Sequence, residues 1–417
     1  MSYVKIVGGK RLKGEVKLQG SKNAALPILA ASVLCRGQIR IENCPDIADV
    51  HELLYALSFA GIKNELHDGR LDLDTSEAVP FSFGQEFAKK TRGGILLLGA
   101  FLGRFHEAEI AYPGGCVIGA RPIDLHCSVL RALHVSLSEE KDGVYAKGRP
   151  QGDRILLSYP SVGATENAVL AAVCGKGRTE LFGAATEPEV AELCRFLNKA
   201  GARIRGIGTS YLVIDGVSQL HGVHHRLSGD RIVAGTYLCA AAMTGGEVIL
   251  RETDGVCLEG ITNNLCAAGL RIQKENNLIA ARANDRVLAV PCIRTAPFPA
   301  FPTDMQSQMV ALLSVADGDS VICETVFESR FGIVPELQKM GADVINTDRY
   351  VIIHGVKHLQ GRPVTATDLR GGAALVLAGL AAEGESKVCG YEYIARGYEN
   401  ICGSLCKLGA EIMLTEE

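Results

Sequence analysis

The residue best placed for chemistry is Cys116, within the segment YPGGCVIGARPID that runs from Tyr112 to Asp124. Glycines on both sides of this cysteine disfavour a regular helix or strand, so the segment is predicted to be a mobile loop. The thiolate is the reactive form of cysteine, and backbone N–H groups together with the nearby Arg121 would favour it. The segment therefore predicts a reactive cysteine, against the alternative that Cys116 is an apolar filler like most of the chain's 14 cysteines.

Length and composition limit what can surround this loop. A chain of 417 residues exceeds the size of one ordinary core, which favours two domains. A hydrophobic content of 47% with 22% charged residues is typical of a globular protein with a large buried interior. The formal charge of −4 provides no general attraction to nucleic acid or an anionic membrane, so a polyanionic ligand would need a local basic cluster.

The common targeting and cofactor signals are missing from the sequence. The first residues, MSYVKIVGGKRLKG, lack the apolar core of a signal peptide, and no apolar run is long enough to span a membrane, so the expected location is the cytoplasm with free thiols. No CxxC pair, GxxxxGK[ST] loop or GxGxxG turn after a strand occurs. We therefore expect no metal and no nucleotide cofactor held by a familiar loop.

The chain also shows internal self-similarity. A unit made of an Ala-rich apolar helix, a Gly-marked turn into a strand and a second, amphipathic helix recurs six times. The copies open at or near Ser21, Thr91, Ser161, Asp230, Asp304 and Asp368. Six copies predict two domains of three repeats, with residues 21–229 carrying the Cys116 loop and residues 1–20 and 230–417 forming the second domain.

The two helices of each repeat differ in their hydrophobic pattern. The first is apolar nearly all round, as in residues 24–33, 168–173 and 373–380, which predicts burial on all sides. The second carries polar residues such as Glu189 and Glu192 along one face. This combination predicts an inside-out α/β arrangement with helices inside and sheets around them.

Most repeats open with a residue type that caps helix N-termini. Such a residue most often only stabilises its own helix and binds no ligand. The positive ends of buried helices favour anions, so several openings at one place would form an anion site. Basic residues also stand beside the openings: Lys22, Arg92, Arg121, Arg231, Arg330, Arg370 and Arg396. Because guanidinium groups bind carboxylate and phosphate through paired hydrogen bonds, we expect a cation-lined cleft where the domains meet.

Seven segments, in order along nearly the whole chain, resemble the UDP-N-acetylglucosamine 1-carboxyvinyltransferase family of enolpyruvyl transferases. They are GSKNAALPIL (20–29), PGGCVIGARPIDLH (113–126), PSVGATEN (160–167), RTAPFPAFPTDMQ (294–306), TVFESRF (325–331), ATDLR (366–370) and RGYE (396–399). The resemblance implies a two-domain inside-out α/β barrel of six βαβαββ-like repeats, three per domain. It also implies transfer of the enolpyruvyl group of phosphoenolpyruvate to the 3′-hydroxyl of UDP-N-acetylglucosamine, with release of phosphate, at the start of peptidoglycan synthesis.

Catalytic roles follow from the resemblance, residue by residue. Cys116 would protonate the methylene carbon of phosphoenolpyruvate, and in the family the epoxide antibiotic fosfomycin alkylates this cysteine. Asp304 would be the base for the sugar hydroxyl. Protonation of an enol ether creates an oxocarbenium-like centre, so an acid and an activated hydroxyl are needed together. Lys22 and Arg396 would balance the developing charge.

Substrate contacts also follow from the resemblance. Phosphoenolpyruvate would be held by Lys22, Asn23, Arg121 and Arg396. The nucleotide sugar would be held by Asn23, Arg92, Arg121, Pro122, Ile123, Asp124, Leu125, Ser161, Val162, Gly163, Asp304 and Val326. Supporting residues would be Arg231, Arg330, Asp368 and Arg370. No metal or organic cofactor is implied, and no membrane or nucleic acid partner beyond the uridine nucleotide.

The chain departs from the family pattern at Ala48 and Tyr159, where the pattern has lysines that would place positive charge against the diphosphate. Two alternatives stay open. The shikimate-pathway enolpyruvyl transferase shares the repeats and arginines but not the PGGC and RPIDL segments. A non-catalytic metabolite-binding or nucleic-acid-binding paralogue could keep the fold, as RNA 3′-phosphate cyclase relatives do. The joint presence of Cys116, Asp304, Lys22 and Arg396 argues against that second alternative.

Overall fold

The structure is a computed structural model that describes residues 2–85, 87, 92–112, 122–253 and 255–416. The described chain divides into two compact units. Unit 1 contains residues 2–19 and 228–416, and unit 2 contains residues 20–112 and 122–227. Cys116 and Arg121 lie outside the described residues.

In the described part of the chain, each unit has three four-stranded sheets, and all six share one connectivity. In every sheet the first strand of the repeat pairs in parallel with the second. The second strand pairs with the fourth and the fourth with the third, both antiparallel. The expected βαβαββ order is confirmed in all six sheets, although in three of them one strand (residues 224–226, 13–17 or 2–7) comes from a distant part of the chain.

Unit 2 has three such sheets, and the strands of each are given in sheet order. The first contains β16 (His224–Arg226), β4 (Gln38–Glu42), β6 (Arg70–Asp74) and β5 (Lys63–His67), and the second contains β7 (Ser82–Phe83), β8 (Glu107–Ala111), β10 (Gly143–Lys147) and β9 (Ser136–Glu139). The third contains β11 (Arg154–Leu156), β12 (Arg178–Phe182), β14 (Tyr211–Asp215) and β13 (Arg203–Arg205). A short pair, β15 (Leu220–His221) and β3 (Cys35–Arg36), completes this unit. Side chains alternate along these strands: in β6, Leu71 and Leu73 are buried while their neighbours are not, as expected for a sheet with one face on the core.

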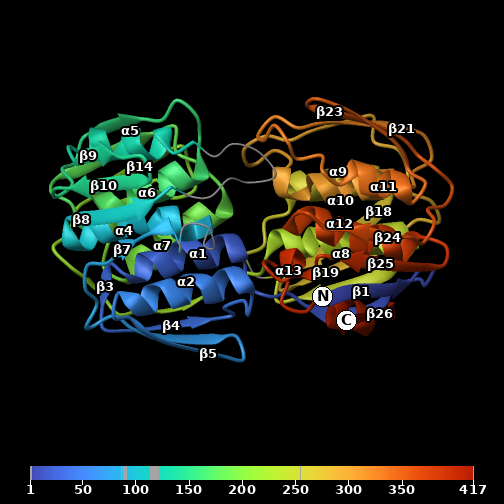
Figure 1. Ribbon diagram of the computed structural model, residues 1–417, viewed down its shortest axis with the longest axis horizontal. Coiled ribbons are helices and arrows are strands. Elements are labelled where there is room, and N and C mark those ends of the chain that lie inside the picture. The colour runs from blue at the N-terminus through green and yellow to red at the C-terminus, as the bar shows by residue number, and fades with distance from the viewer. Residues whose placement is uncertain (1, 86, 88–91, 113–121, 254, 417) are drawn as a thin grey trace. The chain divides into compact units, whose positions relative to one another are not determined.

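The strands of unit 1, in sheet order, are β2 (Lys13–Lys17), β17 (Glu247–Arg251), β19 (Leu278–Ala283) and β18 (Leu270–Glu275); β20 (Cys292–Arg294), β21 (Asp319–Cys323), β23 (Tyr350–His354) and β22 (Asp343–Thr347); and β24 (Pro363–Thr365), β25 (Glu385–Cys389), β1 (Ser2–Val7) and β26 (Glu411–Glu416). The N-terminal strand β1 lies between β25 and β26, so the two ends of the chain meet in one sheet (Figure 1). Strand β2 likewise completes the sheet of β17.

The first helix of each repeat lies inside its unit. In unit 1 these helices are α8 (Arg231–Thr244), α10 (Gln306–Leu313) and α12 (Leu369–Ala381), which pack against one another within the surrounding strands (Figure 1). In unit 2 they are α1 (Lys22–Ser32), α4 (Ile95–Phe105) and α6 (Val162–Ala172). Every residue of α10 is buried, and so is nearly every residue of α8 and α12, which confirms the inside-out prediction.

The second helices of the repeats contact internal helices, strands of the sheets, or both. They are α2 (Ala48–Phe59), α5 (Asp124–Ala132), α7 (Pro188–Lys199), α9 (Glu259–Ala267), α11 (Val334–Lys339) and α14 (Ile401–Lys407), with the short α13 (Tyr391–Ile394) ahead of the last. The polar face expected for α7 holds in part: Arg195 and Lys199 are exposed, whereas Glu189 and Glu192 are each only 5% exposed. Glu192 is buried because it contacts the equally buried His225, with Oε1 and Nε2 3.1 Å apart.

Helix α6 carries a further buried carboxyl group, Glu166, which is 4% exposed. Burial raises its pKa well above the ordinary value of 4.5, and the nearby Glu189 and Glu187 add to the effect. The folded protein therefore keeps Glu166 protonated at a pH where the unfolded chain ionises it. This difference lowers the free energy of unfolding. The loss is negligible well below pH 4.5, where both states bind the proton, and it grows as the pH rises above that value.

We therefore expect Glu166→Gln to stabilise the protein. Glutamine mimics the protonated carboxyl group and does not ionise, so the gain should be about 1–3 kcal/mol at pH 8 and close to zero at pH 4. Thermal melts of both proteins at the two pH values measure it, with Glu140→Gln as a control at an exposed position. A change of equal size at both pH values would contradict the assignment.

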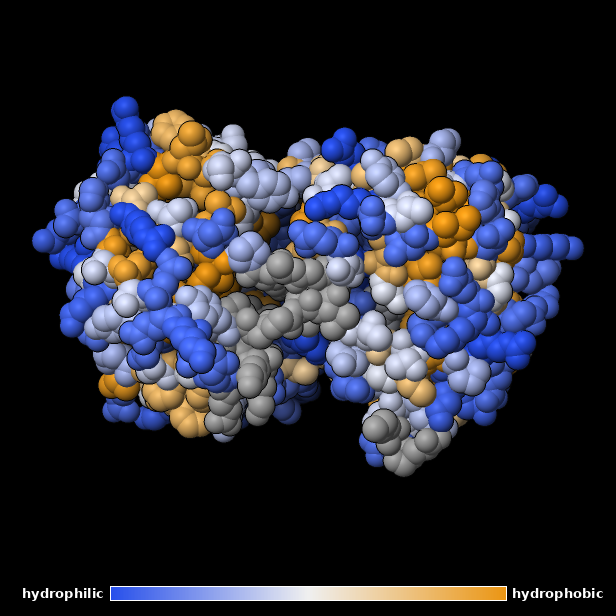
Figure 2. All heavy atoms as spheres, turned by 45° about the horizontal axis from the view of Figure 1, so that its top comes forward, coloured by the Kyte–Doolittle hydropathy of each residue, from blue (hydrophilic) through white to orange (hydrophobic). Residues whose placement is uncertain are grey.

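The visible surface of each unit mixes hydrophilic residues with apolar patches (Figure 2). The exposed large apolar side chains of unit 2 include a row across one sheet, Leu156, Phe182 and Tyr211, on neighbouring strands. None of the described helices combines the length and the apolarity that a bilayer crossing needs.

Candidate active site

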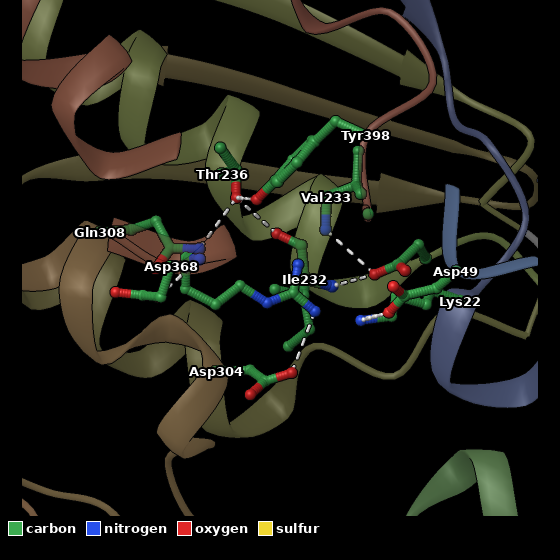
Figure 3. Close-up of polar contacts among 12 residues, drawn as sticks. Lys22, Asp49, Ile232, Val233, Thr236, Asp304, Gln308, Asp368 and Tyr398 are labelled. Atoms are coloured by element: carbon green, nitrogen blue, oxygen red, sulfur yellow. Dashed lines mark hydrogen bonds and ion pairs between the residues drawn. The ribbon is translucent and has the colours of Figure 1, made fainter. Parts of the chain in front are cut away.

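Asp304 of unit 1 is clamped by two buried arginines. It lies in the 3-10 helix η2 (Thr303–Met305), directly before α10. Nη2 of Arg330 donates to its Oδ1 at 2.7 Å. Nη2 of Arg370 donates to its Oδ2 at 3.0 Å, the contact drawn at Asp304 in Figure 3. Both arginine side chains are 4% exposed, whereas Asp304 keeps 26% of its side chain exposed. The two guanidinium groups thus fix the orientation of the carboxylate, which remains partly exposed to solvent.

Arg370 links this clamp to a buried polar network. Burial by itself lowers the pKa of Arg370, but the carboxylates of Asp304 and Asp230, together with Tyr398, outweigh it and raise that pKa above its ordinary value. The guanidinium group lies 5.9 Å from the centre of the Tyr398 ring. The Tyr398 hydroxyl contacts Oγ1 of Thr236 at 2.8 Å, and Nε2 of Gln308 donates to the same Oγ1 at 3.2 Å (Figure 3). The arginine is therefore held rigidly and charged.

Some, but not all, of the repeat openings that carry a capping residue type form a side-chain cap on the helix that follows. Asp230 caps α8 through the N–H groups of Ile232 and Val233, and Asp368 caps α12 through those of Arg370 and Gly371. Ser161 caps α6. Asp304 is not a cap, because Pro302 precedes η2 and the Asp304 carboxylate is directed at the two arginines. Ser21 occupies the cap position of α1 without a side-chain cap bond.

Gln19, which sequence reasoning missed, organises the part of unit 1 around Arg396. Its Nε2 donates to the carbonyl of Gly397 at 3.0 Å, and its Oε1 accepts from the N–H of Glu399 at 3.0 Å. Its own carbonyl accepts from the N–H of Asp230. One buried amide thus fixes the turn after Arg396 against the start of α8. Arg231, in the first turn of α8, is buried beside the Phe298 ring.

In unit 2, Lys22 begins the internal helix α1 and forms an ion pair with Asp49. The distance from Nζ to Oδ2 is 2.9 Å, and the two side chains are 13% and 5% exposed (Figure 3). Asp49 lies in the first turn of α2 and was not predicted, since an acidic residue there reads as a favourable helix start. Asn23 follows Lys22 on α1 and is half-buried. The Asp49 carboxylate therefore fixes the position of the Lys22 ammonium group.

Part of the set expected to hold the nucleotide sugar, residues 122–125 and 161–163, lies at the starts of two helices of unit 2, whereas Asp304 and Val326 belong to unit 1. Asp124 and Leu125 begin α5, Ser161 to Gly163 begin α6, and these two helices pack against each other. The approach is closest at Gly163, where a Cβ atom would lie 2.9 Å from Cε1 of His126. Glycine is therefore required at this position for the two segments to meet.

His126 and Asn167 form the buried core of this junction, and neither was predicted. Oδ1 of Asn167 accepts from the N–H of Gly99 at 2.8 Å, and its Nδ2 donates to the carbonyl of Ile95 and to Nδ1 of His126 at 2.7 Å. Because Nδ1 accepts, the ring proton of the neutral histidine is on Nε2. Burial lowers the pKa of His126 to about 4, with Asp124 acting weakly in the opposite direction. The imidazole is therefore neutral at physiological pH.

The other predicted residues are placed individually. Val326 lies in the loop after β21, where its N–H donates to Oε1 of Glu324. Pro122 is exposed and Ile123 half-buried ahead of α5. Arg92 begins the 3-10 helix η1 (Arg92–Gly94), and its side chain lies outside the described part. At the two departures from the family pattern, Ala48 begins α2 and Tyr159 is 43% exposed. Among the described residues, no group of three or more His, Cys, Asp or Glu side chains is arranged to hold a metal ion.

Comparisons with known proteins agree with this architecture. The model of the family EPSP synthase (3-phosphoshikimate 1-carboxyvinyltransferase) matches residues 6–405. UDP-N-acetylglucosamine 1-carboxyvinyltransferase 2 of Caldanaerobacter subterraneus subsp. tengcongensis is 44% identical over 414 residues, covering 99% of both chains. The UDP-N-acetylglucosamine 1-carboxyvinyltransferase of Dichelobacter nodosus is 44% identical over 419 residues, covering 100% of both.

Solved structures give the same fold. The enolpyruvyl transferase NikO from Streptomyces tendae superposes with a TM-score of 0.88 at 26% identity, covering 99% of both chains. EPSP synthase from Acinetobacter baumannii superposes with a TM-score of 0.76 at 18% identity, covering 100% of both chains, a likeness that shows the fold alone. The identity of 44% over the full length and the shared strand order of all six sheets together show the family of this chain. It belongs to the UDP-N-acetylglucosamine 1-carboxyvinyltransferase family of the enolpyruvyl transferases.

Proposed function

We propose that this protein transfers the enolpyruvyl group of phosphoenolpyruvate to the 3′-hydroxyl of UDP-N-acetylglucosamine and releases phosphate. The observation that carries the proposal is the identity of 43–44% with four relatives of that name over almost the entire chain. The reaction is the first committed step of peptidoglycan synthesis, which would place the protein in the cytoplasm and in cell-wall growth. The shikimate-pathway alternative is weaker, because the EPSP synthase structure shares only 18% identity.

The proposed reaction proceeds by addition and elimination. Cys116 donates a proton to the methylene carbon of phosphoenolpyruvate, the sugar oxygen bonds to the adjacent carbon, and Asp304 takes the hydroxyl proton. In the elimination, the Cys116 thiolate takes back a proton from the new methyl group, the double bond re-forms, and the carbon–oxygen bond to phosphate breaks while the phosphate leaves with the proton that Asp304 took up. Every step is a proton transfer or a carbon–oxygen bond change, so no metal or organic cofactor is needed.

The arrangement around Asp304 supports its role as the base. Two guanidinium groups hold both carboxylate oxygens at 2.7 and 3.0 Å, which favours the charged form that accepts a proton and fixes its direction. Arg330 and Arg370 thus act as positioning residues, and Asp368 does so through its cap on the helix that carries Arg370.

The remaining assignments concern binding. We propose that Lys22, Asn23, Arg121 and Arg396 hold phosphoenolpyruvate, with Arg231 supporting the start of α8. The nucleotide sugar is assigned to Asn23, Arg92, residues 121–125, residues 161–163, Asp304 and Val326. The packing of α5 against α6 at Gly163 supports the assignment, since it brings residues 122–125 close to the N–H groups at the start of α6. Ala48 and Tyr159 should leave the diphosphate with fewer cationic contacts.

Phosphate release tests the proposal directly. The purified protein with phosphoenolpyruvate and UDP-N-acetylglucosamine should release phosphate, and with shikimate 3-phosphate as acceptor it should not. Preincubation with fosfomycin should stop the reaction and add the mass of the drug to the peptide that contains Cys116, while Cys116→Ala should show neither release nor adduct. Absence of release with UDP-N-acetylglucosamine would overturn the function, and an adduct on another cysteine would overturn the role of Cys116.

A further inference from the structure

Glu324, at the end of β21 in unit 1, is a completely buried carboxylate. Its Oε1 accepts from the N–H groups of Val326 at 2.8 Å and Phe327 at 3.1 Å, and from the hydroxyl of Thr295 at 2.9 Å. Its Oε2 accepts from the hydroxyl of Thr303 at 2.8 Å. One side chain thus joins three segments that are separated along the sequence.

The direction of each hydrogen bond follows from the donors. The two backbone N–H groups can only donate. The Thr295 hydroxyl already accepts from the N–H of Thr325 at 2.9 Å, so its own proton is available for Glu324. An ionised carboxylate accepts at every lone pair, which matches four converging donors. These bonds offset the cost of burying the group, a cost that an apolar side chain of similar size would not incur.

The segments that Glu324 joins are those to which the proposed reaction assigns two sugar contacts. Thr303 directly precedes Asp304 in η2, and Val326 lies in the loop on the other side of the carboxylate. The Glu324 side chain is the shared anchor of both. A change at one end therefore weakens the link that fixes the Asp304 segment relative to Val326.

We propose that Glu324 is a positioning residue for the enolpyruvyl transfer, acting through Thr303 to set the place of Asp304. The inference rests on the proposed function. A base must lie within hydrogen-bond reach of the proton it takes, and a displacement of about 1 Å can lower a rate by about 10²-fold. The strength of the effect comes from geometry, since Glu324 touches neither proposed substrate in this assignment.

Thr303→Val tests the inference with the least disturbance. Valine keeps the shape of threonine and removes only the hydroxyl that links the Asp304 segment to Glu324, while the bonds to Val326 and Phe327 remain. We expect kcat for phosphate release to fall about 10- to 100-fold. The KM for UDP-N-acetylglucosamine should stay within about threefold, because most of the assigned sugar contacts are retained. The melting temperature should fall by a few degrees, because Oε2 of the buried Glu324 loses the Thr303 donor, and kinetics are therefore compared at a temperature where both proteins are folded. Thr303→Ser, which restores the hydroxyl, should recover most of the lost kcat.

Two further variants separate geometry from charge and from loss of fold. Glu324→Gln keeps an oxygen for the three donors and an NH2 group that can donate to the Thr303 hydroxyl, so its kcat should stay near that of the unmodified protein. Glu324→Asp is one methylene shorter and cannot span both ends, so kcat should fall. The matched control is Thr262→Val in α9, which removes a hydroxyl that donates to the carbonyl of Leu258 and should leave kcat unchanged.

The outcomes are distinguishable from failure of the proposed function. If the unmodified protein releases no phosphate, the function itself is wrong. If it is active and Thr303→Val retains full kcat, or if Thr303→Ser loses as much as Thr303→Val, the positioning role of Glu324 is overturned. A loss of kcat in Glu324→Gln equal to that in Glu324→Asp would also overturn it, since the charge rather than the geometry would then matter.

Discussion

Asp304→Asn is expected to lower kcat for phosphate release by about 10²- to 10⁴-fold, the usual contribution of a general base. Asparagine has nearly the same shape but cannot take up the proton of the sugar hydroxyl. One of its two terminal atoms is also an NH2 group, which meets the donating guanidinium of Arg330 or Arg370 where a carboxylate oxygen accepted. Steady-state kinetics of phosphate release, together with calorimetric binding of UDP-N-acetylglucosamine, measure the effect.

The control for this prediction is Asp319→Asn. Asp319 is 73% exposed and contacts His354, so the same chemical change there should leave kcat unaltered. Melting curves of both variants establish the temperature at which each is folded, and kinetics are compared below it. If kcat of Asp304→Asn stays within about threefold of the unmodified protein, another group is the base.

Asp304→Ala is expected to be the most destabilising single change in the clamp, by about 2–4 kcal/mol, because it leaves two buried guanidinium groups without their shared carboxylate. The expected loss lies below that of a fully buried ion pair because 26% of the Asp304 side chain is exposed to water. Urea unfolding followed by circular dichroism measures the free energy. As a control, Asp317→Ala breaks the exposed pair with Arg286 and should cost less than about 1 kcal/mol.

A double-mutant cycle tests whether the loss comes from the orphaned cations. Arg370→Met removes one buried charge and keeps most of the side-chain volume. In the double variant with Asp304→Ala, the loss should be smaller than the sum of the two single losses by about 1–3 kcal/mol. Additive losses would show that Asp304 contributes through something other than its ion pairs with the arginines.

The sequence pattern predicted the internal helices correctly because that prediction depends on local information. Helices α8 and α12 are apolar around their whole circumference, and such a helix is stable only when other elements surround it. The sixfold recurrence of the pattern predicted the sixfold recurrence of the sheet, since similar segments satisfy similar constraints. The caps at Ser161, Asp230 and Asp368 were also predictable, because a cap bonds to N–H groups two or three residues away.

The wrong predictions share a cause. Glu189 and Glu192 were placed on a polar face by periodicity, yet both are buried, because their surroundings come from other parts of the chain. Asp304 has the right residue type for a cap, yet its partners are Arg330 and Arg370, which are 26 and 66 residues further along. The spacing of residues along the sequence does not indicate which distant residues become neighbours in the fold.

The sequence alone thus determined the family, the repeats and the residue types available for acid, base and anion-binding roles, because motif order and periodicity are properties of the linear chain. Only the tertiary structure decided which groups act on each other: the ion pair of Lys22 with Asp49, the neutral His126 on Asn167, and the carboxylate of Glu324 that joins Thr303 to Val326. These contacts form between segments that strand pairing and helix packing bring together. Their strength depends on burial, which is a property of the folded protein.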